Sequence, residues 1–474
     1  MGKRFLGFML LLAMSYTAIP QLAWADYDEI FANDARYQQL RAQFDEVIIY
    51  YNNCTTPVMV RKGDKMGIVD GENRVVVPVE YDAINSYGDE LFVLHSGDMQ
   101  GVADAAGRML TPVKYRDVLV FDSEGRHYAL LGEGEEPDLE HGEFYDYQMS
   151  MIDATGKVII PAGYPYLYPM NQGQYDDADS PTLVIVIDRS TSKMGVFDLE
   201  GNLVLPIDYD AIFSSYPHDH IFVEQQGIYG VFNGRGEARM PMEFTDITYD
   251  HGGCMYAAAR LVDGRQKYAF YDMDDKPITG EIFTEVGGTE PNEFVCYNAK
   301  LNGQQMFIGD YHEGLAAFVA VDGDEDFGDE SETPVLYGYL DTRGHEVIKP
   351  QYAVAGEFSC GRAMVVPDGD SMMYGYIDKQ GKMVIPAEYG PSNGGAEGQF
   401  APCGLAMVNQ EATVMFIDVN GKSILMADYG DNFGIVEIGG VTYIAKGNKY
   451  DGYGLYDTKG KFVRKADISE IEWE

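Results

Sequence analysis

Basic residues are scarce in this chain: 34 Lys and Arg residues stand against 76 Asp and Glu residues, which gives a net charge of −42. A surface of this sign repels the phosphates of nucleic acids and of anionic lipids, so neither is expected as a partner. It favours cations, basic proteins or uncharged glycans, although an acidic surface also keeps a protein soluble without any partner.

Catalytic signatures are missing as well. The sequence contains no G-x-S-x-G, H-E-x-x-H, phosphate-loop or dinucleotide-binding motif. Nothing in it therefore identifies a reaction, and we expect a protein that is not an enzyme and has no obligatory cofactor.

Long apolar runs are confined to the N-terminus. Lys3 and Arg4 precede an apolar run over 5–18, and Ala23-Trp24-Ala25 has the small-x-small pattern of a cleavage site. We read residues 1–25 as a signal peptide cleaved after Ala25, since the run is short for a membrane anchor and acidic residues follow at once. The expected product is periplasmic or secreted, with no membrane span after cleavage.

Glycine and tyrosine are abundant, at 54 and 35 residues, which predicts many turns and aromatic strands. Residues 374–389 show the pattern. A strand over 374–377 leads to a turn from Asp378 to Gly381, a second strand ends at Pro386, and Tyr389 follows as a packing aromatic. This unit is a β-hairpin with a trailing segment.

The hairpin recurs along the chain. Its turn begins at Asp70, Asp104, Asp153, Asp198, Asn233, Asp272, Asp341, Asp378, Asp418 and Asp457. An aromatic residue stands eight positions after the turn glycine or its substitute in nine of these ten copies, which makes the repeat real. Segments such as Gly361-Arg362-Ala363-Met364-Val365 precede the hairpin and predict a third strand.

The repeats predict an all-β array of units of about three short antiparallel strands, because one unit alone cannot bury both faces. A β-propeller and a curved β-solenoid both satisfy this requirement. We divide the chain into the signal peptide, a cap over 26–57 with a short helix over about 30–43, a first array over 58–310, and a second array over 311–474 that begins with an acidic insertion.

The pattern resembles the bacterial WG (or KWG) repeat family, whose units combine a Trp-Gly or Tyr-Gly strand, a turn, a Gly-Lys-Val-Ile-Pro strand and a Tyr. The copies at 337–352 and 374–389 match best. The motif tryptophan is never present, and its place is taken by Met66, Met194, Tyr229, Tyr337, Tyr374 and Tyr453. The resemblance implies an all-β envelope or secreted protein that binds something, and it brings no catalytic residues.

Two candidate sites carry named residues. Asp322, Asp324 and Asp326 alternate as oxygen ligands of a calcium loop do, but Phe327 and Thr333 stand where such a loop needs Gly and Glu, so a solvated acidic loop is the alternative. Cys360 and Cys403 hold the same place in adjacent repeats and predict a disulfide if the repeats stack closely; small buried thiols are the alternative.

Weaker candidates have structural explanations. His218, His220 and His251 have loose metal-ligand spacing, and a loop histidine pair is the better interpretation. Ser190 and Lys193 match the S-x-x-K pattern, but Lys193 holds the repeat position of Lys65 before a strand. The ten turn residues fit hairpin chemistry better than a ring of carboxylates, because Asn233 substitutes in one copy.

The sequence therefore predicts an exported scaffold that binds a protein or glycan partner. An envelope hydrolase that uses paired carboxylates on glycan or peptide, and a purely structural envelope protein, are the alternatives. Function is expected where the repeat is interrupted: at 133–143, at 218–220 and at 322–332.

Overall fold

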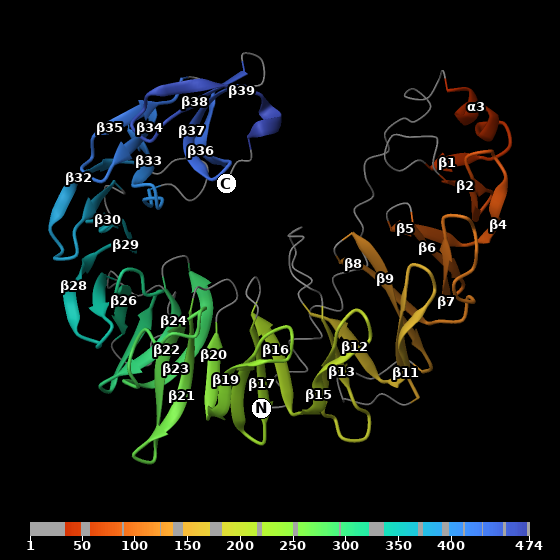
Figure 1. The fold of residues 1–474 in the computed structure, drawn as a ribbon, viewed down its shortest axis with the longest axis horizontal. Coiled ribbons are helices and arrows are strands. Elements are labelled where there is room, and N and C mark those ends of the chain that lie inside the picture. The colour runs from red at the N-terminus through yellow and green to blue at the C-terminus, as the bar shows by residue number, and fades with distance from the viewer. Residues whose placement is uncertain are drawn as a thin grey trace. The chain divides into compact units, whose positions relative to one another are not determined.

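The computed structural model describes residues 34–48, 57–87, 90–123, 125–135, 146–170, 183–215, 220–249, 255–292, 295–321, 336–367, 373–390, 398–410, 413–428, 430–448 and 452–471. In this part of the chain nearly all regular structure is antiparallel β-strand, which confirms the all-β prediction (Figure 1). Two compact units divide the chain. Unit 1 is Met1–Gln226 with Gly230–Arg239, and unit 2 is Gly227–Tyr229 with Met240–Glu474.

Unit 1 begins with the helix α3 (Ala35–Arg41), and each of its sheets is a meander of strands consecutive in sequence. Sheet 1 holds β1 (Glu46–Ile48), β2 (Val58–Lys62), β3 (Lys65–Val69) and β4 (Val75–Tyr81), and sheet 2 holds β5 (Ala83–Tyr87), β6 (Leu91–Ser96) and β7 (Met99–Asp104). Sheet 3 holds β8 (Asp117–Ser123), β9 (Arg126–Glu133), β10 (Gln148–Asp153) and β11 (Val158–Tyr164). Sheet 4 holds β12 (Tyr166–Pro169), β13 (Val184–Ile187), β14 (Met194–Phe197) and β15 (Leu203–Tyr209). Sheet 5 holds β16 (Ala211–Ser215), β17 (His220–Gln225), β18 (Ile228–Phe232) and β19 (Ala238–Phe244), and the unit boundary falls within its last two strands.

Unit 2 opens with a longer sheet. Sheet 6 has nine strands: β20 (Asp246–Tyr249), β21 (Met255–Val262), β22 (Arg265–Asp272), β23 (Phe283–Asn292), β24 (Val295–Leu301), β25 (Gln304–Ile308), β26 (Leu315–Val321), β27 (Tyr337–Asp341) and β28 (Glu346–Tyr352). Sheet 7 holds β29 (Val354–Ser359), β30 (Arg362–Val366), β31 (Tyr374–Ile377) and β32 (Met383–Tyr389), and sheet 8 holds β33 (Leu405–Gln410), β34 (Thr413–Asp418) and β35 (Ser423–Met426). Sheet 9 holds β36 (Asn432–Ile438), β37 (Val441–Asn448), β38 (Gly452–Tyr456) and β39 (Phe462–Ala466), and the 3-10 helix η1 (Ile468–Glu470) follows.

Most repeats have four strands where the sequence predicts about three. In sheet 7, β31 and β32 are the predicted hairpin and β30 is the predicted third strand. The additional strand, β29, begins two residues after Tyr352. Its apolar pattern is interrupted by Gly356, Glu357 and Ser359, so alternation alone does not reveal it.

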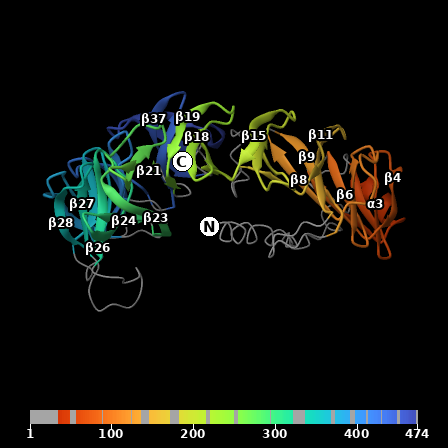
Figure 2. The same cartoon turned by 90° about the horizontal axis from the view of Figure 1, so that it is seen from below.

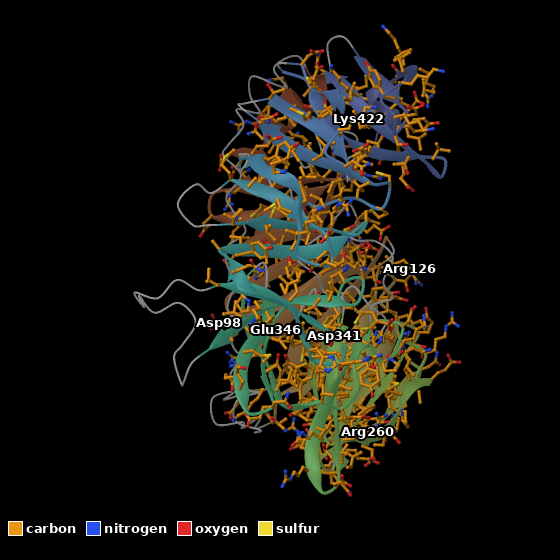
Figure 3. All side chains as sticks on the ribbon, turned by 90° about the vertical axis from the view of Figure 1, so that its left-hand side faces the viewer. Asp98, Arg126, Arg260, Asp341, Glu346 and Lys422 are labelled. Atoms are coloured by element: carbon orange, nitrogen blue, oxygen red, sulfur yellow. The ribbon has the colours of Figure 1, made fainter. Side chains whose placement is uncertain are left out.

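The turn aspartate is fixed by its own backbone. The Oδ1 of Asp378 accepts hydrogen bonds from the amides of Gln380 at 3.1 Å and Lys382 at 2.9 Å, and Gly381 has a φ of 76°. Asp341, labelled in Figure 3, makes the same two bonds. So do the turn residues of the other copies, Asp70, Asp104, Asp153, Asp198, Asn233, Asp272, Asp418 and Asp457. These side chains therefore stabilise the hairpin turns, as the sequence predicts.

The motif positions next to the turn are also structural. Tyr374, in the place of the motif tryptophan, pairs across the strands with Tyr389, and their ring centroids lie 5.9 Å apart. A Cβ added to Gly375 would lie 2.5 Å from the backbone oxygen of Ile385, so only glycine fits there. The pairs Met66–Tyr81, Met194–Tyr209 and Tyr337–Tyr352 repeat the arrangement.

Successive sheets within a unit stack face to face. Along β6, Phe92 and Leu94 pack with Ile68 of sheet 1, whereas Leu91 and Val93 pack with residues of sheet 3. The strand buries both of its faces, which is why its residues are apolar without alternation. In unit 2, sheet 7 packs in the same way with sheets 6 and 8 (Figure 1). Figure 2 shows β26, β27 and β28 of sheet 6 together, seen from below.

The outer faces of sheets 1 and 9 are each covered by a short helical segment. Tyr37 and Leu40 of α3 are buried against sheet 1, and the side chain of Asp34 caps the helix by accepting from the amide of Tyr37 at 2.8 Å. Ile471, directly after η1, packs on Val436 and Tyr453 of sheet 9. The helix predicted over about 30–43 is therefore present as α3, where it covers the face of sheet 1 opposite to the one that packs on sheet 2.

The chain divides differently from the predicted arrays. The predicted boundary at 310/311 lies between β25 and β26, which are hydrogen-bonded neighbours in sheet 6. The compact units meet near residues 226–240 instead. The predicted signal peptide at 1–25 lies outside the described residues. No helix in the described ranges has the length and hydropathy needed to span a membrane.

Candidate metal and ligand site

The candidate site lies in unit 2, in the segments just before the strands β26, β30 and β33 of three successive repeats. In each repeat a buried aromatic residue lies shortly before the glycine that leads into this strand: Tyr311, Phe358 and Phe400. The residue just before each aromatic is polar: Asp310, Glu357 and Gln399. We call these three side chains the polar ladder, because they hold one repeat position in neighbouring repeats.

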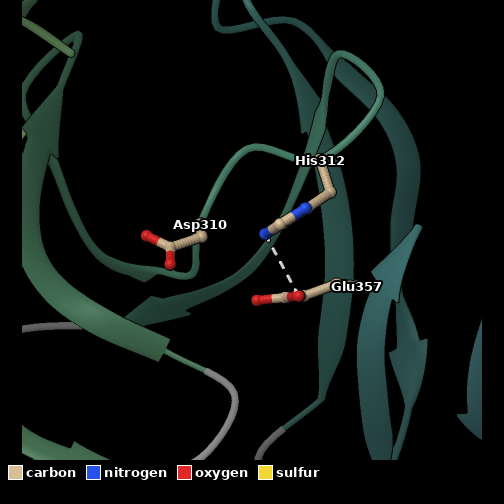
Figure 4. A group of neighbouring side chains, drawn as sticks. All are labelled: Asp310, His312 and Glu357. Atoms are coloured by element: carbon tan, nitrogen blue, oxygen red, sulfur yellow. Dashed lines mark ion pairs between the residues drawn. The ribbon is translucent and has the colours of Figure 1, made fainter. Parts of the chain in front are cut away.

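Glu357 is the centre of the ladder. Its Oε2 lies 3.1 Å from Nε2 of His312 and accepts a hydrogen bond from Nε2 of Gln399 at 3.2 Å. Asp310 completes the group, since one ligand atom from each of Asp310, His312 and Glu357 lies within 4.8 Å of the others. Figure 4 shows the imidazole of His312 pointing at the carboxylate of Glu357, with Asp310 on the same strand connection as His312.

The histidine and the glutamate stabilise each other's charge. The hydrogen bond to Glu357 raises the pKa of His312, burial opposes the shift, and the carboxylates of Glu357, Asp310 and Glu313 add to it. Burial would raise the pKa of Glu357, but the bonds from His312 and Gln399 outweigh it and hold that pKa below its ordinary value. Both side chains are about one-third exposed, so solvent and small ions can reach them.

Contacts of Glu313 with the next repeat hold the segment 310–314 in place. The carboxylate of Glu313 accepts a hydrogen bond from the amide of Gly361 at 3.0 Å and pairs with Nζ of Lys379 at 3.1 Å. Lys379 also donates to the backbone oxygen of Glu313 at 2.8 Å. Because Gly361 and Lys379 belong to the next repeat, the turn over 310–314 is fixed against it before any ligand binds.

The group offers one imidazole nitrogen and two carboxylates. Nitrogen and oxygen donors of this kind suit zinc and similar transition-metal cations, whereas calcium and magnesium prefer oxygen alone. Without a cation the same residues make an ion pair between repeats.

The two predicted sites remain predictions. Asp322, Asp324 and Asp326 lie outside the described residues, and so does the interrupted segment at 322–332. The Sγ of Cys360 lies 3.3 Å from the backbone oxygen of Ala401, two residues before Cys403. The segments that carry the two cysteines are therefore neighbours, as the predicted Cys360–Cys403 disulfide requires, but the bond itself is not tested.

The histidines and the S-x-x-K residues have structural roles where the structure describes them. His220 is buried, with its ring centroid 5.9 Å from that of Phe222. His218 and His251 lie outside the described residues, as does most of the segment at 133–143. The Oγ of Ser190 donates to Asp188 at 2.7 Å and the Nζ of Lys193 pairs with Asp210 at 2.5 Å, so the S-x-x-K residues serve a turn and a surface ion pair.

Sequence reasoning missed the group of Asp310, His312 and Glu357. The three residues span 48 positions in two repeats, and no known metal-binding spacing links them. One signal was available: aligning the repeats on Tyr311, Phe358 and Phe400 places Asp310 and Glu357 at the same position. The contribution of His312, two residues further on, needs the structure.

The comparisons with known proteins support the repeat family. A family model described as "WG containing repeat" matches residues 149–178, 337–369 and 374–390. No curated protein matches the sequence. Two solved structures are similar at low TM-scores: a eukaryotic initiation factor (0.24, 11% identity, 89% of this chain and 98% of that chain) and BamB from Moraxella catarrhalis (0.26, 12% identity, 64% and 88%).

At such scores these likenesses carry no argument about this chain. The family matches, however, fall on strands already described: β10–β12, β27–β30, and β31 with β32. In these segments the turn, the close-packed glycine and the cross-strand aromatic pair explain why the motif recurs. The chain therefore contains segments similar to the WG repeat, in which tyrosine or methionine stands in the place of the motif tryptophan.

Proposed function

We propose that this protein is an exported scaffold that binds a partner in the cell envelope and catalyses no reaction. The observation that carries the proposal is that the motif residues of the repeat and the polar ladder have different roles. The motif residues build turns, strand pairs and contacts between sheets. The polar ladder instead changes from Asp310 to Glu357 to Gln399 while its position stays fixed, as expected of a variable surface on a constant framework.

A protein partner is the class we favour. The chain carries a net charge of −42, and the ladder presents two carboxylates and the exposed amide of Gln399 in succession. Such a row suits the basic side chains and backbone groups of a partner segment. An uncharged glycan is the other outcome that the experiment below distinguishes.

The hydrolase alternative is less well supported. Glycoside hydrolysis by paired carboxylates needs one carboxyl group with a raised pKa to act as the acid. In the ladder, hydrogen bonds lower the pKa of Glu357. A purely structural envelope role predicts that no ligand is found, and the same experiment tests it.

The test is a comparison of three baits. Wild-type chain, the ladder variant Asp310→Asn/Glu357→Gln, and a control variant Asp98→Asn/Glu346→Gln are immobilised and exposed to envelope proteins and to a glycan panel. Asp98 and Glu346 are exposed and lie away from the ladder in sequence, so the control removes the same charge. A ligand kept by wild type and control but lost from the ladder variant supports the proposal; a ligand kept equally by all three, or none at all, contradicts it.

Export is tested separately. The proposal places the mature N-terminus at Asp26, after cleavage behind Ala25. N-terminal sequencing of protein recovered outside the cytoplasm should begin at Asp26, and recovery of the uncleaved chain in the cytoplasm would contradict it.

A further inference from the structure

We propose that Asp310, His312 and Glu357 form a binding site for one divalent transition-metal cation of the zinc class, which links two neighbouring repeats of unit 2. Asp310 and His312 lie in the connection between β25 and β26, and Glu357 lies on β29 of the following sheet. Nothing in the repeat motif requires these three residues. The site is independent of the identity of the partner proposed above.

The spacing of the ligand atoms supports the site. Two ligands at about 2.1 Å from a zinc ion at the tetrahedral angle are roughly 3.4 Å apart. The Nε2 of His312 and the Oε2 of Glu357 are 3.1 Å apart, which is close to that value before any rearrangement. The Asp310 ligand atom is within 4.8 Å of both, and we expect this side chain to rotate toward the ion on binding.

The charge around the group also supports a cation. Asp310 and Glu357 place two carboxylates within 4.8 Å of each other, and Glu313 adds a third nearby that is paired with Lys379. His312 is the one residue of these three that can carry a positive charge. Carboxylates this close repel each other, and a dication offsets the repulsion more fully than a single proton on His312 can.

Two neighbours complete the arrangement. The amide of Gln399 lies 3.2 Å from the Glu357 carboxylate, and half a turn of the amide presents its oxygen as a fourth donor. The bonds from Gly361 and Lys379 to Glu313 hold the turn that carries His312. Preformed support of this kind is what orients ligands in metal sites. The imidazole nitrogen favours zinc over calcium or magnesium.

The test is calorimetric titration of the purified chain with ZnCl₂ and, separately, with CaCl₂. We expect one zinc site whose affinity falls at least tenfold in His312→Gln and in Glu357→Gln. His345→Gln is the matched control: the Nδ1 of His345 also lies 3.1 Å from a carboxylate oxygen, that of Asp341, but that pair belongs to no three-ligand group in the described residues. The control should bind zinc as wild type does.

A second measurement covers the case in which a variant folds poorly. Asp310→Asn leaves the His312–Glu357 pair intact and should also weaken zinc binding. Zinc K-edge absorption of the loaded wild type should show nitrogen and oxygen neighbours at about 2.0–2.2 Å and no sulfur. The inference is overturned if zinc produces no binding heat at millimolar concentration, if His312→Gln binds as tightly as His345→Gln, or if sulfur ligands appear. If the wild-type chain binds no zinc but still captures its partner, this site is refuted and the proposed function is not.

Discussion

Replacing the turn residue Asp378 tests whether the recurring aspartate is framework. In Asp378→Ala the amides of Gln380 and Lys382 lose the carboxylate oxygen at 3.1 and 2.9 Å. Each such bond contributes about 1 kcal/mol net, and water replaces part of it at a surface turn. We therefore expect the free energy of unfolding to fall by about 1–2 kcal/mol.

Asp378→Asn is the matched variant. Asn233 fills this position naturally, and its Oδ1 accepts the same two amides at 3.0 and 2.9 Å. The asparagine variant should therefore stay within about 0.5 kcal/mol of wild type, since it keeps both acceptor bonds.

Repeat arrays can unfold unit by unit, so a urea transition should be combined with hydrogen exchange of a peptide covering 374–389. Asp378→Ala should shift the urea midpoint and speed exchange in that peptide. If alanine is as stable as wild type, or if asparagine destabilises as much as alanine, the turn explanation fails and a role for the negative charge gains support.

Three further outcomes follow from single contacts. Gly375→Ala should destabilise unit 2 by more than about 2 kcal/mol, because the added Cβ would lie 2.5 Å from a backbone oxygen. In the same urea titration Gly356→Ala should have little effect, because the atom nearest to its added Cβ is 3.6 Å away. Tyr339→Phe should lower the free energy of unfolding by about 1 kcal/mol, because it removes a 2.7 Å hydrogen bond to a backbone oxygen. Tyr376→Phe should leave that free energy unchanged, because the Tyr376 hydroxyl has no hydrogen-bond partner among the described residues. Equal losses in the two variants would contradict this. Hydrogen bonds from side-chain hydroxyls of its own turn lower the pKa of Asp188 to about 2, below the ordinary 3.8, so its stabilising contribution is present above about pH 4 and is lost as the pH falls toward 2; an NMR titration midpoint near 3.8 would refute this.

The framework could be predicted from the sequence because it rests on local chemistry. The turn from Asp378 to Gly381, the strand end at Pro386 and the aromatic at Tyr389 each have a short-range cause, and repetition along the chain separates them from chance. The cap helix followed from the apolar spacing of Tyr37 and Leu40, which are buried in the structure.

The rest depends on contacts between repeats. β29 was missed because Gly356 and Glu357 hide its alternation, although β30, its neighbour in sheet 7, pairs with it. The continuity of sheet 6 across 310/311 arises because β25 and β26 pair directly, which no local pattern states. The site was missed for the same reason: His312 meets Glu357 only when sheets 6 and 7 stack.

The candidate site lies outside the segments at 133–143, 218–220 and 322–332, where function stays a prediction. Function was expected where the repeat is interrupted, yet Asp310 and Glu357 occupy an ordinary repeat position before a buried aromatic. In a repeat array a constant position can carry variable side chains, so a site can run across the repeats as well as through their insertions.

The central claim is that the polar ladder, and not the turn aspartates, contacts the partner. Hydrogen–deuterium exchange of the chain with and without its captured partner tests it most directly. The account predicts new protection in peptides covering 309–314, 356–361 and 398–404, with unchanged exchange at the hairpin turns 341–344, 378–381 and 418–421. Protection confined to those turns, or protection that persists undiminished in Asp310→Asn/Glu357→Gln, would contradict it.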